Sequence, residues 1–363
     1  MQTILLRCPR RARFHFGQVG LGENMALSDT AVLAHSDTLF SAIINTAAVF
    51  PDTAMLDDLI DAFKEGKVGI SSANFCWQVS ASDYIWFLPK PAISNEPNQS
   101  VDTSKAQSLD TGRRKEFGKV RFLSKGVWES DFTPADWFDP DKCLILDGKF
   151  VVTQTEALKI PEAYRHARTK LYEVVNLPKV RVHAADQQQG FFGQAAVQLG
   201  YWDENCRVHY YMLTQMPEDK RLAAFFRTVM QLLIDQGIGG ERRVGCGQLT
   251  EIEWRTDLNE LPTEPTALQM SLSLLNPKSV AELGECLSYE TVIRGGRRIT
   301  VAGENEVYLN RIRMILEGAI SQKALDGRVV NINPYDETPH PFYRLGRHFS
   351  ISLPQNLMPY VQQ

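Results

Sequence analysis

The chain has 363 residues, 44% of them hydrophobic, and a formal net charge of −4. Its length predicts two domains with real hydrophobic cores, and its acidic balance argues against a free-standing nucleic-acid binder, so any nucleic acid is expected at a local basic patch. Six separated cysteines without metal-knuckle spacing, no signal peptide and no apolar run near the roughly 18 residues of a membrane span predict a cytoplasmic protein with reduced thiols and no membrane, metal or cofactor.

The first predicted elements are a short strand and two helices. Residues 3–6 form an apolar strand, and four arginines within residues 7–13 make a basic cluster, although a solvated rim explains such a cluster more often. Apolar residues at three- and four-residue spacing over residues 39–47 predict a helix with Ser36 or Asp37 as its N-cap. A second helical pattern covers residues 53–64 and ends at Gly66.

Strands are predicted at residues 68–72 and 84–88, and Pro89 ends the second one. From residue 92 to about 190 the apolar pattern loosens, and the polar stretch 95–110 is predicted to be a mobile loop. Residues 113–125, which include Arg121, interleave basic and aromatic side chains. That pattern suits base stacking with phosphate contact, but it also suits a protein interface or an amphipathic segment without a binding role.

After this insertion the pattern regains strands and a helix. Residues 195–201 and 208–213 are predicted to form a strand pair joined by a polar turn. Pro217 is predicted at the start of a helix whose apolar stripe runs to Leu233 and whose end is capped by Gly237. A glycine-rich loop follows this helix, and a strand is predicted after it at residues 248–254.

The loop at residues 237–247 is the most informative segment of the sequence. Five glycines and two arginines lie in it: Gly237, Gly239, Gly240, Gly245 and Gly247, with Arg242 and Arg243. Glycine lets a ligand approach the main chain closely, and arginine offers a planar fork of donors that suits phosphate. The segment lacks the ending of a P-loop, and its helix-to-strand order is the reverse of a dinucleotide loop. A grip on a sugar-phosphate backbone and a plain surface turn both stay open.

Pro262 and Pro265 mark a linker to a second half. Beyond it the pattern predicts a helix at 278–287, a strand-turn-strand at 291–301, and strands at 267–275, 310–317, 327–332 and 349–353. Without the insertion the first half reads β-α-β-β-α-β, the ferredoxin-like unit, and the second half is a degenerate repeat. The sequence therefore predicts an α+β chain of two ferredoxin-like (RRM-type) domains, residues 1–258 and 259–363, with an insertion at about 92–190.

Catalytic groups are sparse. His15 and His35 could act as general acid and base in RNA cleavage, but a structural hydrogen bond explains a histidine beside a helix cap at least as well. The carboxylates at 57–61 and 139–141 are interpreted as a solvated helix face and a turn rather than a metal site. Residues 340–348 are dense in aromatic and cationic side chains and suit packing on RNA, docking between domains or a core strand.

Several segments, in the same order along the chain, resemble the RAMP-superfamily (Cas5-like) subunit four of the type III-A CRISPR Csm complex. Residues 35–43, His-Ser-Asp-Thr-Leu-Phe-Ser-Ala-Ile, are similar to its first-helix motif. Residues 70–73 and 86–91 resemble its next strands, 237–247 its glycine-rich loop and 340–346 its C-terminal block. The insertion is the least similar part.

The resemblance implies a non-catalytic RNA-binding subunit in antiviral defence, with two ferredoxin-like domains and a protruding thumb. The insertion in the first domain would form the thumb, with residues 113–125 in or near it. Such a subunit holds the 5′ handle of the CRISPR guide RNA. It also bridges the large polymerase-like Cas subunit to the RAMP backbone subunit, and it meets target RNA only indirectly. The Pro-Gly-Ser-Ser-Leu-Lys-Gly motif of the target-cleaving backbone subunit is missing from this sequence.

Carried over residue by residue, the resemblance predicts an RNA-binding set made of the loop, the first-helix motif and further basic residues. Its members are Gly237, Gly239, Gly240, Arg242, Arg243, Gly245, Gly247, His35, Ser36, Asp37, His15, Arg13 and Arg121. No catalytic residue, metal or cofactor is expected. Two rival hypotheses stay open: a metal-independent CRISPR RNA-processing endoribonuclease of the same superfamily that uses His15 or His35, and a module that binds only proteins.

Overall fold

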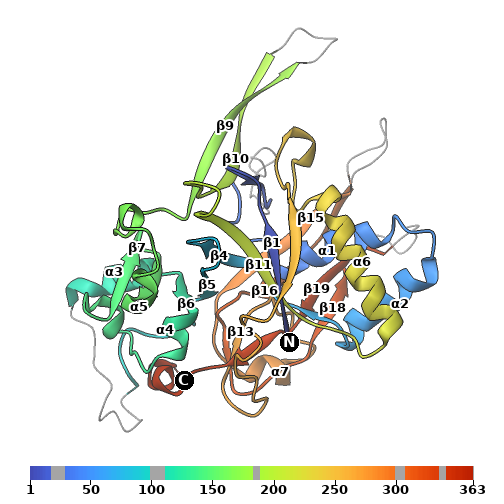
Figure 1. Cartoon of the computed structure of the whole chain (residues 1–363). Coiled ribbons are helices and arrows are strands. Elements are labelled where there is room, and N and C mark those ends of the chain that lie inside the picture. Colours follow the sequence, from blue (N-terminus) through green and yellow to red (C-terminus); the bar gives the residue numbers. More distant parts are fainter. Residues whose placement is uncertain (18–28, 99–110, 183–188, 299–306, 335–340, 363) are drawn as a thin grey trace.

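The computed structural model describes residues 1–17, 29–98, 111–182, 189–298, 307–334 and 341–362 (Figure 1). The chain is an α+β protein with a large central sheet, helices packed on one face of the sheet and a C-terminal part that packs on the other face. Residues 327–331 and 343–347 of the C-terminal part also contact the helices. A long hairpin projects from one end of the molecule (Figure 1).

Nine strands of the described chain form the central sheet. Their bounds, in spatial order, are β12 (Glu251–Arg255), β1 (Gln2–Arg7), β11 (Arg207–Gln215), β4 (Asn74–Gln78), β5 (Tyr84–Pro89), β6 (Phe122–Ser124), β8 (Phe150–Thr153) and β7 (Cys143–Leu146), with β3 (Gly69–Ile70) beside β11. Neighbouring strands are antiparallel except β6 and β8, which are parallel. In the register of the sheet, Leu5 of β1 lies opposite Tyr211 of β11 and opposite Glu253 of β12.

Helices α1 (Ser36–Ala47), α2 (Thr53–Glu65) and α6 (Lys220–Gln236) cover one face of this sheet. The segment α1 to α2 connects β1 to β3 and β4, and α6 connects β11 to β12. Alternate side chains of a strand point to opposite faces. Ile4 and Leu6 accordingly pack in one core with residues of α1 and α6, whereas Leu5 packs in a second core on the other face.

The three helices predicted in the first half are confirmed, with shifted ends. α2 ends at Gly66, whose φ of 76° gives the left-handed cap that glycine adopts easily. α6 begins at Lys220 because the side chain of Asp219 caps it, so the predicted start at Pro217 is wrong. The N-cap of α1 is His35, one residue before the predicted position. In the part of the chain that the structure describes, no helix combines the length and apolarity needed to cross a membrane.

The predicted loose insertion contains an ordered lobe at residues 111–164. In this lobe β6, β7 and β8 extend the central sheet, and short helical segments accompany them: α3 (Arg114–Lys119), α4 (Lys125–Glu129), α5 (Gln154–Ala157), η1 (Thr111–Arg113), η2 (Asp136–Phe138) and η3 (Glu162–Tyr164). Trp137 is fully buried and stacks on Phe117. Elements of three to six residues leave no periodic apolar pattern, so the sequence did not predict them. Residues 99–110 of the predicted mobile loop lie outside the described residues.

Strands β9 (Tyr172–Val182) and β10 (Gln189–Leu199) form the projecting hairpin, and β2 (Arg13–Phe14) pairs with β10 near its base. Residues 195–201 and 208–213 were predicted to pair with each other, and this prediction is wrong. The strand β10 pairs with β9 and β2, whereas β11 belongs to the central sheet. The predicted polar turn is present and is closed by a bridge between Tyr201 and Arg207. Hairpin signals in a sequence cannot show where two strands diverge into different sheets.

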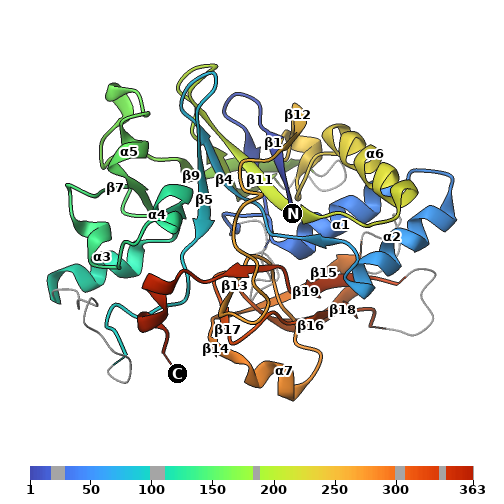
Figure 2. The same cartoon turned by 60° about the horizontal axis from the view of Figure 1, so that its bottom comes forward.

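The C-terminal part consists of a small sheet and two ribbons, packed below the central strands in Figure 2. Its elements are β14 (Cys286–Ser288), β17 (Ile320–Ser321), β13 (Gln269–Ser271) and β20 (Ser350–Ser352) in the sheet, β15 (Thr291–Arg298) with β16 (Val307–Ile315), β18 (Gly327–Asn331) with β19 (Tyr343–Arg347), α7 (Val280–Gly284) and η5 (Gln355–Tyr360). The predicted strand-turn-strand is wrong, because residues 291–298 form one strand whose register shifts between Arg294 and Gly296. Residues 299–301 of that prediction lie outside the described residues.

Candidate nucleic-acid interface

The glycine loop leaves α6, packs against β2 and leads to β12. The N–H of Gly240 donates to the carbonyl of His15 at 2.8 Å, and the N–H of Gly247 donates to the carbonyl of Arg13 at 2.7 Å. The Ile238 N–H donates to the Gly247 carbonyl at 2.9 Å and closes the two ends of the loop on each other. The structure therefore brings Arg13 and His15 together with the predicted loop residues.

Three of the loop glycines are required by contacts inside the protein. Gly237, Gly239 and Gly247 have positive φ, and a Cβ at any of them would lie 2.2–2.6 Å from a backbone carbonyl oxygen. At these three positions the missing Cβ makes room for the protein's own main chain, and ligand approach to them stays a prediction. Gly245 has a φ of 89° and no described atom within 4 Å of its Cβ position, so its main chain faces open space.

Free backbone donors are found at the tip of the loop. Most loop amides, including those of Gly240 and Gly247, are already bonded within the protein. The N–H groups of Glu241, Arg242 and Arg243 have no partner among the described residues. Because Glu241 has a φ of 56° and the next two residues form the 3-10 turn η4 (Arg242–Val244), these consecutive donors suit a small anion such as a phosphate oxygen.

The two arginines of the tip are both exposed but differ in their contacts. Arg242 donates to the Gln236 carbonyl at 3.0 Å, at the C-terminal end of α6, where a cation is favoured by the helix dipole. The guanidinium of Arg243 has no partner among the described residues and is available to a ligand. A planar guanidinium suits bidentate contact with phosphate.

Two more cations approach the loop from the neighbouring strands. Burial, and then the charge of Glu241, raises the pKa of the Cys246 thiol. The positive charges of Lys179 and Arg13 lower this pKa, because both side chains lie close to the thiol. Arg13 also donates to Gln198 of β10 at 3.1 Å. We call Arg13, Lys179, Arg242 and Arg243 the loop patch. The sequence did not predict Lys179, because its strand β9 lies in the insertion, where no apolar pattern indicated a hairpin.

His15 is a structural residue of this site. Its side chain is 4% exposed, and its Nδ1 lies 2.8 Å from the Ala195 carbonyl oxygen of β10. Its own carbonyl accepts from Gly240, so His15 joins β2 to β10 and to the loop. The predicted roles in RNA contact and in acid-base catalysis both require an accessible imidazole, which this arrangement does not provide.

Ser36 and Asp37 of the first-helix motif are fully buried and are not brought together with the loop, and RNA contact by this motif stays a prediction. The Ser36 hydroxyl accepts from the Leu274 N–H at 3.0 Å. The Asp37 carboxylate accepts two hydrogen bonds of 2.9 Å from Arg294 and lies 3.6 Å from Arg344. Burial alone raises the pKa of Asp37, but the two guanidinium groups lower it to about 2. The motif therefore joins α1 to the C-terminal part.

His35 takes part in the same connection. Its Nδ1 lies 2.9 Å from the Glu317 carboxylate, which also accepts from the Ser72 hydroxyl. Burial works to raise the pKa of Glu317, but His35 and Ser72 lower it below its ordinary value. His35 is thus held beside a buried carboxylate at the start of α1, and its RNA contact stays a prediction.

Arg121 belongs to another surface. It is exposed at the start of β6, where its N–H donates to the Lys149 carbonyl and its carbonyl accepts from the Lys90 N–H, both at 2.8 Å. Burial, and then the charge of Arg121, lowers the pKa of Lys90 to about 8. Among the described residues no contact joins Arg121 to the loop patch.

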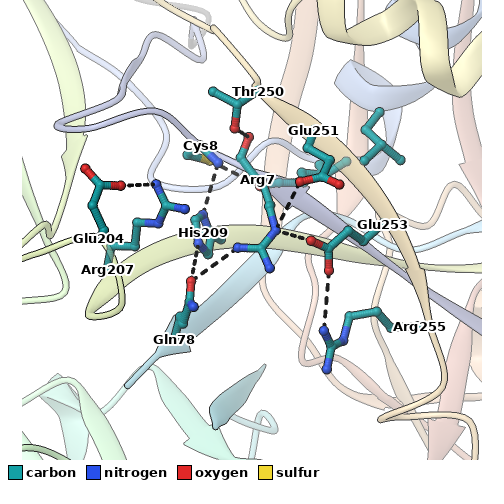
Figure 3. Close-up of polar contacts among 12 residues, drawn as sticks. Arg7, Cys8, Gln78, Glu204, Arg207, His209, Thr250, Glu251, Glu253 and Arg255 are labelled. Carbon is teal, nitrogen blue, oxygen red and sulfur yellow. Dashed lines mark hydrogen bonds and ion pairs between the residues drawn. The ribbon is translucent and has the colours of Figure 1, made fainter. Parts of the chain in front are cut away.

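A second polar cluster, which the sequence did not predict, lies on the strands β1, β4, β11 and β12 (Figure 3). The Cys8 N–H donates to His209 Nδ1 at 3.0 Å, so the proton of the neutral ring is on Nε2, which lies 3.3 Å from Gln78 Oε1. Burial, and then Arg207 and Arg7, lowers the pKa of His209 to about 3. With both ring nitrogens bonded, His209 serves the packing of the sheet rather than catalysis.

No group of three or more His, Cys, Asp or Glu residues placed to hold a metal ion occurs in the described ranges. The free cysteines are buried except Cys286, which is half-buried.

Comparisons with known proteins agree on one family. A family model of the CRISPR Csm4 C-terminal domain matches residues 264–353. The CRISPR system Cms protein Csm4 of Methanocaldococcus jannaschii is 22% identical over 287 residues, which are 73% of this chain and 70% of that protein.

Solved structures give the same result for the fold. A chain from the crystal structure of a Csm1–Csm4 cassette in complex with pppApA is 18% identical and has a TM-score of 0.52, with 98% of this chain and 100% of that chain covered. A chain from the cassette in complex with cA4 has a TM-score of 0.51 at 18% identity, covering 97% of this chain and 98% of that one. Together with the family model and the curated relative, these matches support a Csm4 subunit of a type III CRISPR Csm complex.

Proposed function

We propose that the chain is a non-catalytic RNA-binding subunit of a type III-A interference complex that caps the 5′ handle of the CRISPR guide RNA. The observation that carries the proposal is the loop patch, where unbonded amides of Arg242 and Arg243 lie beside the guanidinium of Arg243. Backbone donors and cations in one place are what a sugar-phosphate chain requires.

The proposed contact is prepared before RNA arrives. Gly237, Gly239 and Gly247 fit the loop tightly to itself and to β2, and His15 holds β2 against β10. The donors at the tip therefore do not need to be ordered on binding, which reduces the entropic cost of binding. Contact with phosphates alone gives no base specificity, so handle recognition also requires contacts to splayed bases.

We propose further that the fold consists of two ferredoxin-like units and a thumb. The antiparallel order β12-β1-β11-β4, with α1 and α6 in the crossovers, supports the first unit. The small C-terminal sheet is the degenerate second unit. The thumb is assigned to the hairpin β9–β10 rather than to residues 113–125, because the hairpin is the part that projects. Lys179 of the thumb lies at the loop patch, so handle and thumb contacts are continuous in this proposal.

Within such a complex the chain would bridge the large polymerase-like subunit to the RAMP backbone subunit. The similar solved chains come from Csm1–Csm4 cassettes, which supports a Csm1-type large subunit as one partner. The non-catalytic assignment is supported by His15 and His35, because both imidazoles are already bonded within the protein.

The test uses the purified, fully assembled complex. We expect Arg242→Ala with Arg243→Ala to lower guide-RNA content several-fold and to leave the 5′ end of the remaining RNA open to exonuclease. The matched control is Arg221→Ala, an exposed arginine at the other end of α6, roughly 20 Å away along the helix. Unchanged RNA content and protection in the double variant would reject the handle-capping proposal.

The endoribonuclease alternative is tested separately with repeat RNA and no metal ion. We expect no cleavage by the purified chain. Cleavage that is lost in His15→Ala or His35→Ala, while both variants keep the wild-type circular dichroism spectrum, would establish the enzyme instead.

A further inference from the structure

A pocket of about 700 Å³ lies in the C-terminal part, between α7 and the ribbon β15–β16. Its apolar lining includes Val280 and Leu283 of α7 and Ile315 of β16, and Lys278, Arg313 and Arg328 also line it. Figure 1 shows α7 at the end of the molecule opposite the projecting hairpin. The pocket is therefore separate from the loop patch.

The apolar side chains of α7 face outward because the helix is fixed from beneath. Glu282 is buried, and its carboxylate accepts from the N–H groups of Asp326 at 2.7 Å and Gly327 at 3.0 Å. With Glu282 directed inward, Val280 is left 86% exposed. A short helix held in one orientation with a bare valine on its outer face has the form of a binding surface rather than of a frayed end.

Exposed apolar side chains form part of the lining of this pocket. Of the ten large hydrophobic side chains that are exposed in the described chain, three line this pocket: Val280, Leu283 and Tyr289. Exposed apolar surface that is contiguous rather than scattered marks an interaction site, because covering it releases the water that it orders.

The charge of the lining has one sign. No carboxylate lines the pocket, although the whole chain carries a net charge of −4. The guanidinium of Arg313 is exposed and has no side-chain partner among the described residues. Arg328 uses its Nε to bond Asn276 at 2.7 Å, and Lys278 pairs with Asp326 at the half-exposed rim. A bound segment that brings carboxylates would satisfy these cations.

We propose that this α7 pocket receives an acidic segment of a partner protein, in which an aliphatic or aromatic side chain is flanked by carboxylates. The apolar side chain would lie on Val280 and Leu283, and the carboxylates would meet Arg313 and Arg328. A polypeptide fits better than RNA because the apolar lining is mostly aliphatic and Tyr289 is the one aromatic side chain in it, whereas single-stranded RNA is held by stacking on several aromatic rings.

The experiment selects 12-residue peptides from a random displayed library on the full chain and removes those that also bind the Val280→Asp variant. We expect the enriched peptides to carry Asp or Glu on both sides of an apolar residue. The strongest peptide, labelled with fluorescein, should bind Val280→Asp and Arg313→Glu at least tenfold more weakly in anisotropy titrations, and raised salt should weaken its binding to the wild type.

Matched controls and a rescue make the outcome decisive. Leu158→Asp alters a side chain that is 69% exposed in the lobe, and it should leave peptide binding unchanged. A peptide in which lysine replaces only the acidic residue that meets Arg313 should regain binding to Arg313→Glu. Enriched peptides without acidic residues, or binding unaffected by both pocket variants, would overturn the proposal. Binding of labelled oligouridine that is lost in Arg313→Glu but not in Leu158→Asp would overturn it in favour of RNA.

Discussion

The Asp37 carboxylate is held by Arg294, which lies 257 positions further along the chain, and by Arg344 beyond it. The sequence drew attention to this motif by its resemblance to a known family, and the inference of RNA contact came from its place at a helix start. The buried salt bridge could not be predicted, because nothing local in the sequence pairs an acid of α1 with arginines on two separate C-terminal ribbons. The resemblance was informative about family, but the role of the residue required the packing.

Removing Asp37 leaves Arg294 as a buried charge without its partner. We expect Asp37→Ala to lower the free energy of unfolding by about 3–5 kcal/mol, and the double variant Asp37→Ala with Arg294→Met to lose less than the single variant. Urea denaturation of the full chain measures both. Asp61→Ala, which breaks an exposed pair with Lys64, is the control and should change stability by about 0.5 kcal/mol or less. If the double variant lost as much unfolding free energy as the two single variants lose together, the buried-pair explanation would be contradicted.

His209 makes stability depend on pH in a defined window. Its pKa is about 3 in the folded chain and near the ordinary 6.5 when unfolded, so the unfolded chain binds more protons between these values. Its contribution to stability is complete above pH 6.5 and is lost as the pH falls towards 3. Between pH 7.5 and 5 we expect the wild type to lose about 2 kcal/mol more than His209→Gln, measured by urea denaturation at both pH values. Equal losses in the two proteins would refute this assignment.

At the scale of elements, long and periodic segments were predictable and short or diverging ones were not. α2 and α6 follow from apolar spacing and end at glycines, as predicted. The lobe strands β6, β7 and β8 have three or four residues each, which is too short for a periodic signal. The hairpin β9–β10 was not predicted because β9 lies in the insertion, where no apolar pattern indicated a strand. The sequence therefore predicted only part of the candidate site: it predicted the glycine loop but not Lys179.

The glycine loop gives a prediction in which two similar substitutions have different effects. A Cβ at Gly247 would lie 2.2 Å from the Ile238 carbonyl oxygen, whereas a Cβ at Gly245 would meet nothing within 4 Å among the described atoms. Both positions have positive φ, so both alanine variants carry backbone strain. We expect Gly247→Ala to cost about 1–3 kcal/mol more than Gly245→Ala and to speed the hydrogen exchange of the Gly240 amide. Equal costs would show that the loop is not packed as described.

At the scale of the whole molecule, both large cores draw on distant parts of the chain. The core on the face of the sheet opposite α1, α2 and α6 joins Leu5 and Tyr211 to Met270 and Ile351 of the C-terminal part. The buried pair of Asp37 and Arg294 ties the same two regions together. The predicted division at residue 258 stays a prediction about architecture, but the shared core argues that the two parts are stable only together.

We therefore expect the chain to unfold in a single transition. All six tryptophans lie before residue 259, so tryptophan fluorescence reports on the first part alone, whereas far-UV circular dichroism reports on the whole chain. The two signals should follow the same curve in urea. A chain shortened to residues 1–258 should aggregate, because it exposes the face that carries Leu5 and Tyr211. Two separated transitions in the full chain would contradict a common core.

This shared core has a consequence for synthesis on the ribosome. The strands that carry Leu5 and Tyr211 emerge well before Ile351, and at ~10 residues per second the gap between Tyr211 and Ile351 lasts on the order of ten seconds. During that interval the hydrophobic face of the nascent sheet is exposed to solvent. Chaperones, or an early assembly partner, have that time in which to shield it.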